Sequence, residues 1–186
     1  MKALYLLLFL TTFTVCSQAA PAHSSKVVSS ADILKLSQEL IGQKRWEDAK
    51  KQLGALNKRR KGVSRLERAE LNFNYGLCLE KLGKTDDALK TYISLIAVYG
   101  SYVTWSSQAL ERGFNLSYQK TELEKKINAY KYLRKILYMF QKFQETDDPS
   151  GALSRIRKRL PEVAKELKLT TEQQRDIDIS LGIIEE

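Results

Sequence analysis

AELNFNYGLCLEKLGKTDDALKTY, residues 69–92, is a helical stretch that two glycines interrupt. Its apolar residues recur at intervals of three and four, which is the spacing of one helix face. Gly76 and Gly83 lie inside this pattern, although glycine in a helix costs about 1 kcal/mol relative to alanine. Because the chain has only nine glycines in 186 residues, we expect both to serve the packing or the ending of a helix.

The same helical periodicity extends over nearly all of the chain beyond its first 29 residues. This part is low in proline and glycine and rich in Leu, Lys and Glu, and it contains no convincing alternating strand pattern. The pattern breaks at residues 57–64, 98–103, 117–122, 145–151 and 168–173. We therefore predict an all-α protein of seven or eight helices.

Helix-start signals occur near the C-terminal end. Asp148 and Pro149 suit the start of one helix, and Pro161 suits the first turn of another. Thr170, followed three residues later by Gln173, resembles a capping box that opens a short last helix. We expect these last helices to cap the part of the chain that precedes them.

An internal repeat relates the predicted helix pairs. With an offset of 39 residues, SADILKLSQELIGQKRWEDAKKQLGAL aligns with the sequence that begins at Ala69, and Ser37 falls on Gly76. A further offset of 41 residues aligns ELNFNYG with ERGFNLS, so that Ser117 takes the place of Gly76. The repeat units are residues 30–61, 69–100 and 102–143, and the C-terminal helices lie in 149–186.

The middle unit resembles the tetratricopeptide repeat, a family of units of about 34 residues that each form two antiparallel helices. The resemblance rests on the small residues Gly76 and Ala88, the cap glycine Gly83 and the aromatic Tyr92. It implies an α-solenoid of about three such helix pairs with capping helices at the C-terminal end.

Close packing of the paired helices explains the small residues. Small side chains let two helices approach, and a glycine ends the first helix in a left-handed conformation. At the position of Gly83, the first unit has Lys44 and the third has Glu124. The residues expected to pack the repeats are Ser37, Ala49, Gly76, Gly83, Ala88, Tyr92, Ser117 and Ala129.

The first 19 residues have the pattern of a secretory signal peptide. Lys2 is followed by an apolar run of about 13 residues, which is too short to span a membrane. Small residues favour cleavage after Ala19; lipoprotein processing at Cys16 is the alternative, although Val15 before it is unfavourable. We therefore expect an exported chain, periplasmic or associated with a bacterial-type cell envelope, in which residues 20–29 form a flexible leader.

Charge is unevenly distributed along the chain. The net charge of +9 falls to +8 when the signal peptide and its Lys2 are removed. From Thr170 onward, five carboxylates and one arginine give −4, so the body before it carries +12. This balance fits an anionic glycan, a lipid surface or an acidic peptide as partner, or simply solvated helix faces. Nucleic acid is not expected, despite the basic runs at 58–61 and 155–159, because the chain is exported.

The sequence lacks the residue sets of common active sites. His23, the only histidine, lies in the leader, so the folded part can form no Ser-His-Asp or Cys-His arrangement. No Cys and His cluster has zinc spacing, and no glycine-rich phosphate loop occurs. Cys78, the one cysteine left after signal removal, lies in an apolar pattern and is expected to be buried. We expect no catalysis, no cofactor and no metal ion.

The remaining expectation is an interaction scaffold or adaptor that binds a protein or peptide. The resemblance implies that the first helices of successive units line a concave groove, where Asn74 and Asn115 would lie one above the other. A side-chain amide offers donors and an acceptor to an extended peptide backbone. The first unit would contribute Leu34, Gln38 and Ile41. The other groove residues carried over from the family are Glu70, Phe73, Asn74, Leu77, Glu80, Lys81, Glu111, Phe114, Asn115 and Tyr118.

Several alternatives stay open. Phe73 and Phe114 could pack against neighbouring helices instead of facing a partner. The chain could be an accessory subunit of an envelope transport or assembly complex, or could bind anionic cell-wall glycan or lipid through its basic face. The stretch NAYKYLRKILYMFQKF, residues 128–143, has a wide apolar surface that is either core or an assembly face.

Overall fold

The computed structural model describes residues 28–59, 61–119, 122–143 and 147–185. The expected signal peptide and most of the leader lie outside these residues. Within them the regular structure is helical and no strand occurs, which confirms the all-α fold class. The helices are α1 (Ser30–Gly42), α2 (Trp46–Asn57), α3 (Arg65–Lys81), α4 (Thr85–Tyr99), α5 (Val103–Tyr118), α6 (Leu123–Met139), α7 (Ala152–Glu166) and α8 (Thr171–Ser180).

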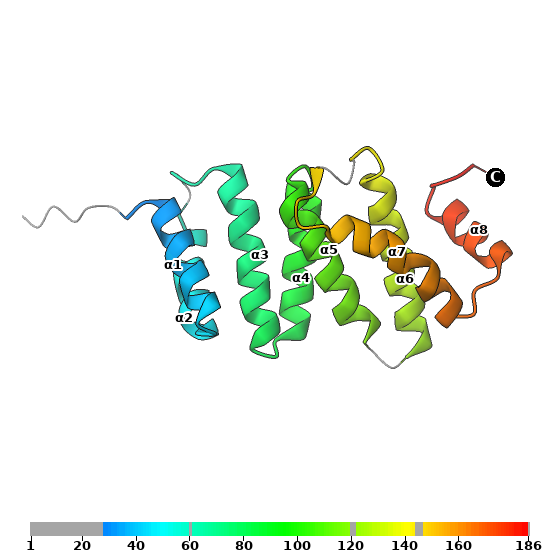
Figure 1. The fold of residues 1–186 in the computed structure, drawn as a ribbon, viewed down its shortest axis with the longest axis horizontal. Coiled ribbons are helices and arrows are strands. Elements are labelled where there is room, and N and C mark those ends of the chain that lie inside the picture. Colours follow the sequence, from blue (N-terminus) through cyan, green and yellow to red (C-terminus); the bar gives the residue numbers. More distant parts are fainter. Residues whose placement is uncertain (1–27, 60, 120–121, 144–146, 186) are drawn as a thin grey trace, which may run out of the picture.

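Helices α1 to α6 form a row in which consecutive helices pack against each other and alternate in direction (Figure 1). Besides its sequence neighbours, α3 also packs against α1 and α5, whereas no comparable contacts join α2 to α4 or α4 to α6 in the described part of the chain. The odd-numbered helices therefore form a closely spaced inner layer, and the even-numbered ones a wider-spaced outer layer. We call the exposed side of α1, α3 and α5 the inner face.

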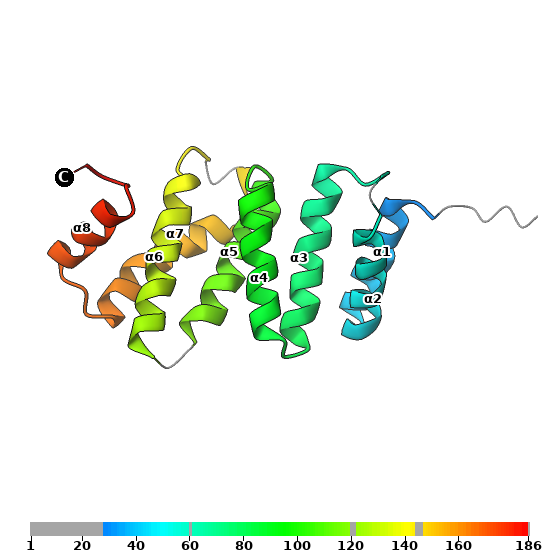
Figure 2. The ribbon, with the colours of Figure 1, turned by 180° about the vertical axis from the view of Figure 1, so that it is seen from behind.

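Helix α7 departs from the row. It runs obliquely across α5 and α6 and packs against both (Figure 1). It lies on the side of the inner face, and the view from behind shows α4 and α6 in front of it (Figure 2). The C-terminal helices thus cover part of the inner face rather than extending the row.

The turns after α1 and α3 have the same geometry. Lys44 and Gly83 both adopt left-handed conformations, with φ of 60° and 75°. In each turn the amide of this residue bonds to the carbonyl three residues back, and the next amide bonds to the carbonyl five residues back. The C-cap of α1 therefore forms without glycine, because the hydrogen bonds of the turn outweigh the cost of a left-handed lysine.

The third unit departs from the repeat alignment, and its turn lies within the predicted break at 117–122. Glu124 does not lie in a turn but in the first turn of α6, where a carboxylate is favourable at the positive end of the helix. Helix α5 ends at Tyr118, so Ser117 is the second-to-last residue of that helix. Gly76, in contrast, lies five residues before the last residue of α3. Gly113 has that place in α5 instead.

The three helix-start predictions of the C-terminal region have different outcomes. Asp148 and Pro149 lie shortly before α7, which begins at Ala152, and the Asp148 carboxylate accepts a hydrogen bond from the amide of Leu153. Pro161 does not open a helix but lies inside α7. A buried apolar stripe on α7, which includes Leu153 and Val163, holds the helix together across the proline, whose ring is exposed. The capping box of Thr170 and Gln173 at the start of α8 is confirmed.

Two hydrophobic cores lie along the row. The main core extends through α3 to α8. The N-terminal core lies between α1, α2 and α3, and Tyr75 packs against both cores. Its buried residues are Ile33, Leu34, Leu40, Ala49, Leu53, Leu56, Leu71 and Cys78.

Tyr92 of α4 is fully buried between two glycines of the inner layer. A Cβ added to Gly76 of α3 would lie 2.6 Å from Cε1 of Tyr92. A Cβ added to Gly113 of α5 would lie 3.7 Å from its Cβ. The tyrosine ring therefore fills the space that the missing side chain of Gly76 leaves.

Candidate binding surface

The inner face holds most of the groove residues expected from the sequence, but their exposure differs. On α3, Lys81 is exposed, Glu70, Leu77 and Glu80 are half-buried, and Asn74 is buried. On α1, Gln38 is exposed, Ile41 is half-buried and Leu34 is buried. The accessible part of this face is therefore mainly polar.

Both phenylalanines of the repeated Phe-Asn pair point into the main core. Phe73 is 5% exposed, and its ring centroid lies 5.5 Å from that of Trp105 and 6.2 Å from that of Tyr92. Phe114 is 3% exposed and stacks on Tyr118 at 5.2 Å. These aromatic rings build the floor of the inner face and present little surface to a partner.

The two asparagines that follow them differ from each other. Asn74 is 6% exposed, and its Nδ2 is buried without a hydrogen-bond partner. It is the one buried side-chain nitrogen or oxygen in this condition among the residues that the structure describes. Asn115 is exposed. A buried amide that makes no hydrogen bond costs about 1–3 kcal/mol. Asn74 therefore lowers the stability of the fold.

A carboxylate lies beside this amide on the same helix. Glu70 precedes Asn74 by one turn, and its Oε1 accepts a hydrogen bond of 2.5 Å from Nε2 of Gln38. Burial raises the pKa of the Glu70 carboxyl above its ordinary value, and the nearby Glu67 adds to this shift. The bond from Gln38 opposes the shift and joins α1 to α3 across the face.

Glu80 connects three helices. Its carboxylate accepts a 2.9 Å hydrogen bond from the hydroxyl of Tyr92 on α4 and another of 2.9 Å from Nη1 of Arg112 on α5. Burial, and then the Glu80 charge and hydrogen bond, raise the pKa of the Tyr92 phenol. The phenol therefore stays protonated and donates, which fixes α3, α4 and α5 relative to one another.

Helix α7 covers the groove residues of α5. Arg155 donates from Nε and Nη2 to the two carboxylate oxygens of Glu111, both at 2.7 Å. The hydroxyl of Tyr118 donates to Glu166 at 2.7 Å, and burial together with this bond raises the tyrosine pKa to about 12. A cavity of about 240 Å³ remains beside these contacts. It is lined by Gln108, Glu111, Arg112, Asn115 and Arg155.

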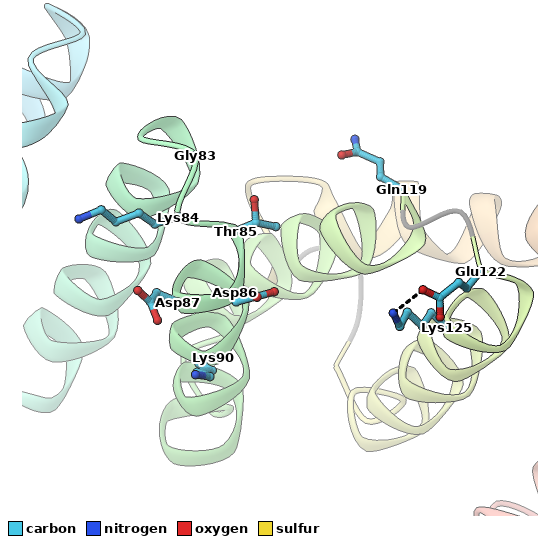
Figure 3. A pocket seen from close by; sticks show the side chains of 9 residues that line it. All are labelled: Gly83, Lys84, Thr85, Asp86, Asp87, Lys90, Gln119, Glu122 and Lys125. Carbon is cyan, nitrogen blue, oxygen red and sulfur yellow. Dashed lines mark hydrogen bonds and ion pairs between the residues drawn. The ribbon is translucent and has the colours of Figure 1, made fainter.

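A large cavity lies away from this face, at the turns that precede α4 and α6 (Figure 3). Its volume is about 1010 Å³, and lysines and carboxylates line it in similar numbers. Lys125 and Glu122 form an ion pair of 2.6 Å there. With charges of both signs and no apolar floor, this cavity selects no particular class of ligand.

The repeat-packing residues lie between the helices of each pair. Gly83 is the exposed exception, because it forms the turn, and Ser117 is half-buried. The others, which are Ser37, Ala49, Gly76, Ala88, Tyr92 and Ala129, are buried.

Reactive groups are few in the described part of the chain. No group of three or more His, Cys, Asp or Glu side chains there could hold a metal ion. Cys78 is buried in the N-terminal core, and burial raises its thiol pKa to about 11. A thiol with this pKa is almost entirely protonated at neutral pH and is a poor nucleophile.

Three residues of the inner face were not among the groove residues predicted from the sequence. Arg112 and Gln108 of α5, and Arg155 of α7, line the remaining cavity. Arg155 belongs to the basic run RIRKR, which indicated charge but no location. Only the packing of α7 on α5 brings it to this face, and a repeat alignment contains no such information.

Comparison with protein-family models, with curated proteins and with solved structures returned no match. Among the described residues, no helix has both the length and the apolar character needed to cross a membrane.

Proposed function

We propose that this chain is an interaction scaffold of the tetratricopeptide-repeat type, which binds a segment of a partner protein on the inner face of α1, α3 and α5. The sequence pattern of residues 1–19 supports export, and we propose that the scaffold works in a bacterial-type cell envelope. It would act there as an adaptor or as an accessory subunit of a larger complex.

The observation that carries this proposal is the unpartnered amide of Asn74. A buried donor without an acceptor lowers stability, and such groups in native proteins call for an explanation. Rotation of the Asn74 side chain toward the inner face would let its Nδ2 donate to a partner's backbone carbonyl. Glu70 and Lys81 on the same face, with Arg112, would add polar contacts of both signs.

Helix α7 limits where the partner can bind. It covers the end of the inner face formed by α5, through Glu111 and Tyr118. Among the described helices, none covers the part formed by α1 and α3, where Gln38 and Lys81 are exposed. The proposed binding segment therefore lies over α1 and α3 and ends near Arg155.

The substitution Asn74→Leu tests this function. Leucine has nearly the same size and leaves no unpaired donor, so we expect the free energy of unfolding to rise by about 1–2 kcal/mol. The partner that chemical cross-linking captures from the native envelope should be lost at the same time. Phe114→Leu, in the covered part of the face, is the control and should keep the partner.

Two results would contradict the proposal. If Asn74→Leu melts below the unmodified chain, the amide is satisfied within the fold and no longer indicates a site. If the captured partner is retained by the stable variant, binding occurs elsewhere. Retention that instead falls steeply as salt rises would favour the anionic glycan or lipid surface as ligand.

A further inference from the structure

The outer layer contains a second surface, on the side of the molecule away from α7. Two cavities of about 310 and 280 Å³ follow the seam between α4 and α6. Figure 2 shows these two helices in front, with α5 between and behind them. Because α4 and α6 are both packed on α5 but hardly on each other, the seam is a groove, which we call the α4–α6 groove.

The floor of this groove is apolar and accessible. Leu89 and Ile93 of α4 and Tyr132 of α6 line one cavity, and Ala97 and Met139 line the other. Ile93 is 42% exposed and Met139 is 51% exposed. Neighbouring exposed apolar side chains on a soluble helical protein are typical of an interaction site.

Tyr132 adds an unsatisfied polar group to this floor. Within the described part of the chain its hydroxyl makes no hydrogen bond, and burial raises the pKa of the phenol to about 12. A protonated phenol of this kind can donate to a carboxylate or carbonyl of a bound segment.

The dimensions of the groove suit one short helix. Its α4 wall runs from Leu89 to Gly100, which is about 16 Å at 1.5 Å per residue. A helix of about three turns would place apolar residues at i, i+3 or i+4, and i+7 along such a seam.

The walls carry charge of one sign. No carboxylate of the described part of the chain lines either of the two cavities. Lys125 and Lys142 line the two cavities directly. Lys125 is paired with Glu122, and the Lys142 ammonium lies over the ring of Phe143. An apolar floor with basic walls is complementary to a helix that has one apolar and one acidic face.

We propose that the α4–α6 groove is the docking site for an acidic amphipathic helix of a partner protein. It is separate from the inner face, so the chain would hold two partners, or two parts of one partner, on opposite sides. The apolar stripe of the partner helix packs on Ile93, Tyr132 and Met139. Its carboxylates face Lys125 and Lys142, which line the two cavities.

Fluorescence anisotropy with a labelled model peptide tests this proposal on the full chain. The peptide is helical, about three turns long, with leucines along one face and glutamates elsewhere; a twin carries lysines in place of the glutamates. We expect the acidic peptide to bind at least tenfold more tightly than its basic twin. Ile93→Lys should weaken acidic-peptide binding by tenfold or more, and the Lys125→Glu, Lys142→Glu double variant by a similar factor.

Leu36→Lys is the matched control, because Leu36 is exposed on α1 to 43%, nearly the same fraction as Ile93. It should leave the affinity unchanged, and so should Asn74→Leu on the inner face. Should Ile93→Lys fail to fold, the double lysine variant still tests the groove, because it changes only side chains at its solvent edge.

Three outcomes would overturn the proposal. The first is equal affinity for the acidic peptide and its basic twin. The second is an equal loss of affinity in Leu36→Lys and Ile93→Lys. The third is a concentration-dependent dimer in sedimentation that Ile93→Lys abolishes, together with no peptide binding, because a second copy would then cover the groove.

Discussion

The pairs α1–α2 and α3–α4 are built alike, whereas α5–α6 follows the same plan only in its second helix. Buried residues of α2 recur in α4 at an offset of 39, as Leu53 and Tyr92 show, and those of α4 recur in α6 at 41, as Leu133 shows. In α5 the helix ends early and α7 covers it. The outer helices α2, α4 and α6 therefore share the same buried positions. The inner helix α5, on which α7 packs, does not follow α3 at the same offset.

The largest expected effect comes from substitutions in the two hydrophobic cores. Leu153 of α7 and Leu53 of α2 are both fully buried, and truncation of either leucine to alanine should lower the free energy of unfolding by about 2–5 kcal/mol. Urea denaturation measures the loss. Arg155→Ala, which removes an exposed ion pair with Glu111 and an exposed hydrogen bond to the Ser150 carbonyl, should cost less than about 1 kcal/mol. A larger loss for Arg155→Ala than for Leu153→Ala would mean that α7 is held by its surface charges.

Gly76 and Gly113 sharpen the comparison between α3 and α5. A Cβ at position 76 would lie 2.6 Å from the buried ring of Tyr92, which its bond to Glu80 holds in place. Gly76→Ala should therefore destabilise the fold by about 1–3 kcal/mol. A Cβ at position 113 meets its nearest neighbour at 3.5 Å, so Gly113→Ala should raise stability by up to about 1 kcal/mol through helix propensity.

Thermal melts of both glycine variants decide this point. Equal effects at the two positions would show that α3 and α5 approach α4 equally closely, contrary to the geometry around Tyr92.

A smaller effect is expected at the caps. Lys44 and Lys168 adopt φ of 60° and 55°, in turns that end α1 and α7. Glycine has no Cβ to strain this conformation, so Lys44→Gly and Lys168→Gly should each stabilise the protein by about 1 kcal/mol. Gly83→Ala, the reverse change in the equivalent turn of α3, should destabilise it by a similar amount. Chemical denaturation measures these changes. Equal free energies of unfolding for the unmodified chain and Lys44→Gly would contradict the prediction.

The smallest expected effect is a pH dependence of the free energy of unfolding, which the Glu70 carboxyl causes where α1 packs on α3. The pKa of Glu70 is raised in the folded state, so its contribution to stability is present below its ordinary value of 4.5 and is lost as the pH rises through the raised value. Glu70→Gln should therefore gain stability over the unmodified chain as the pH increases toward neutrality. Glu67→Gln should show the opposite slope, because hydrogen bonds from Ser30 and Ser64 lower its pKa. Parallel stability curves for the two variants would refute this assignment.

Much of the helical layout follows from local signals in the sequence. The predicted breaks at 98–103 and 117–122 contain the observed ends of α4 and α5, and the turn at Gly83 follows from its neighbours. Such features depend on contacts within a few residues. The repeat alignment assigned Ser117 to the wrong place because it assumes one offset for both helices of a unit, whereas α5 ends 37 residues after α3 and the buried residues of α4 recur in α6 at 41.

The binding surface was less accessible to prediction. Sequence spacing placed Phe73 on the inner face, but its burial depends on Trp105, which no repeat position specifies. The Asn74 amide lacks a hydrogen-bond partner, and Arg155 lies on the inner face. Both features result from tertiary packing. The residues that face solvent between packed helices can be identified only when the neighbours of each helix are known.

The presence of two cores joined through Tyr75 has a consequence for cooperativity. Because α1 and α2 bury their apolar residues in the smaller core, we expect them to open locally while the main core remains folded. The inner face crosses the boundary between these units at the bond from Gln38 to Glu70. A segment bound there would add contacts to both units at once, so occupancy of the face would convert two independently opening halves into a single cooperative one.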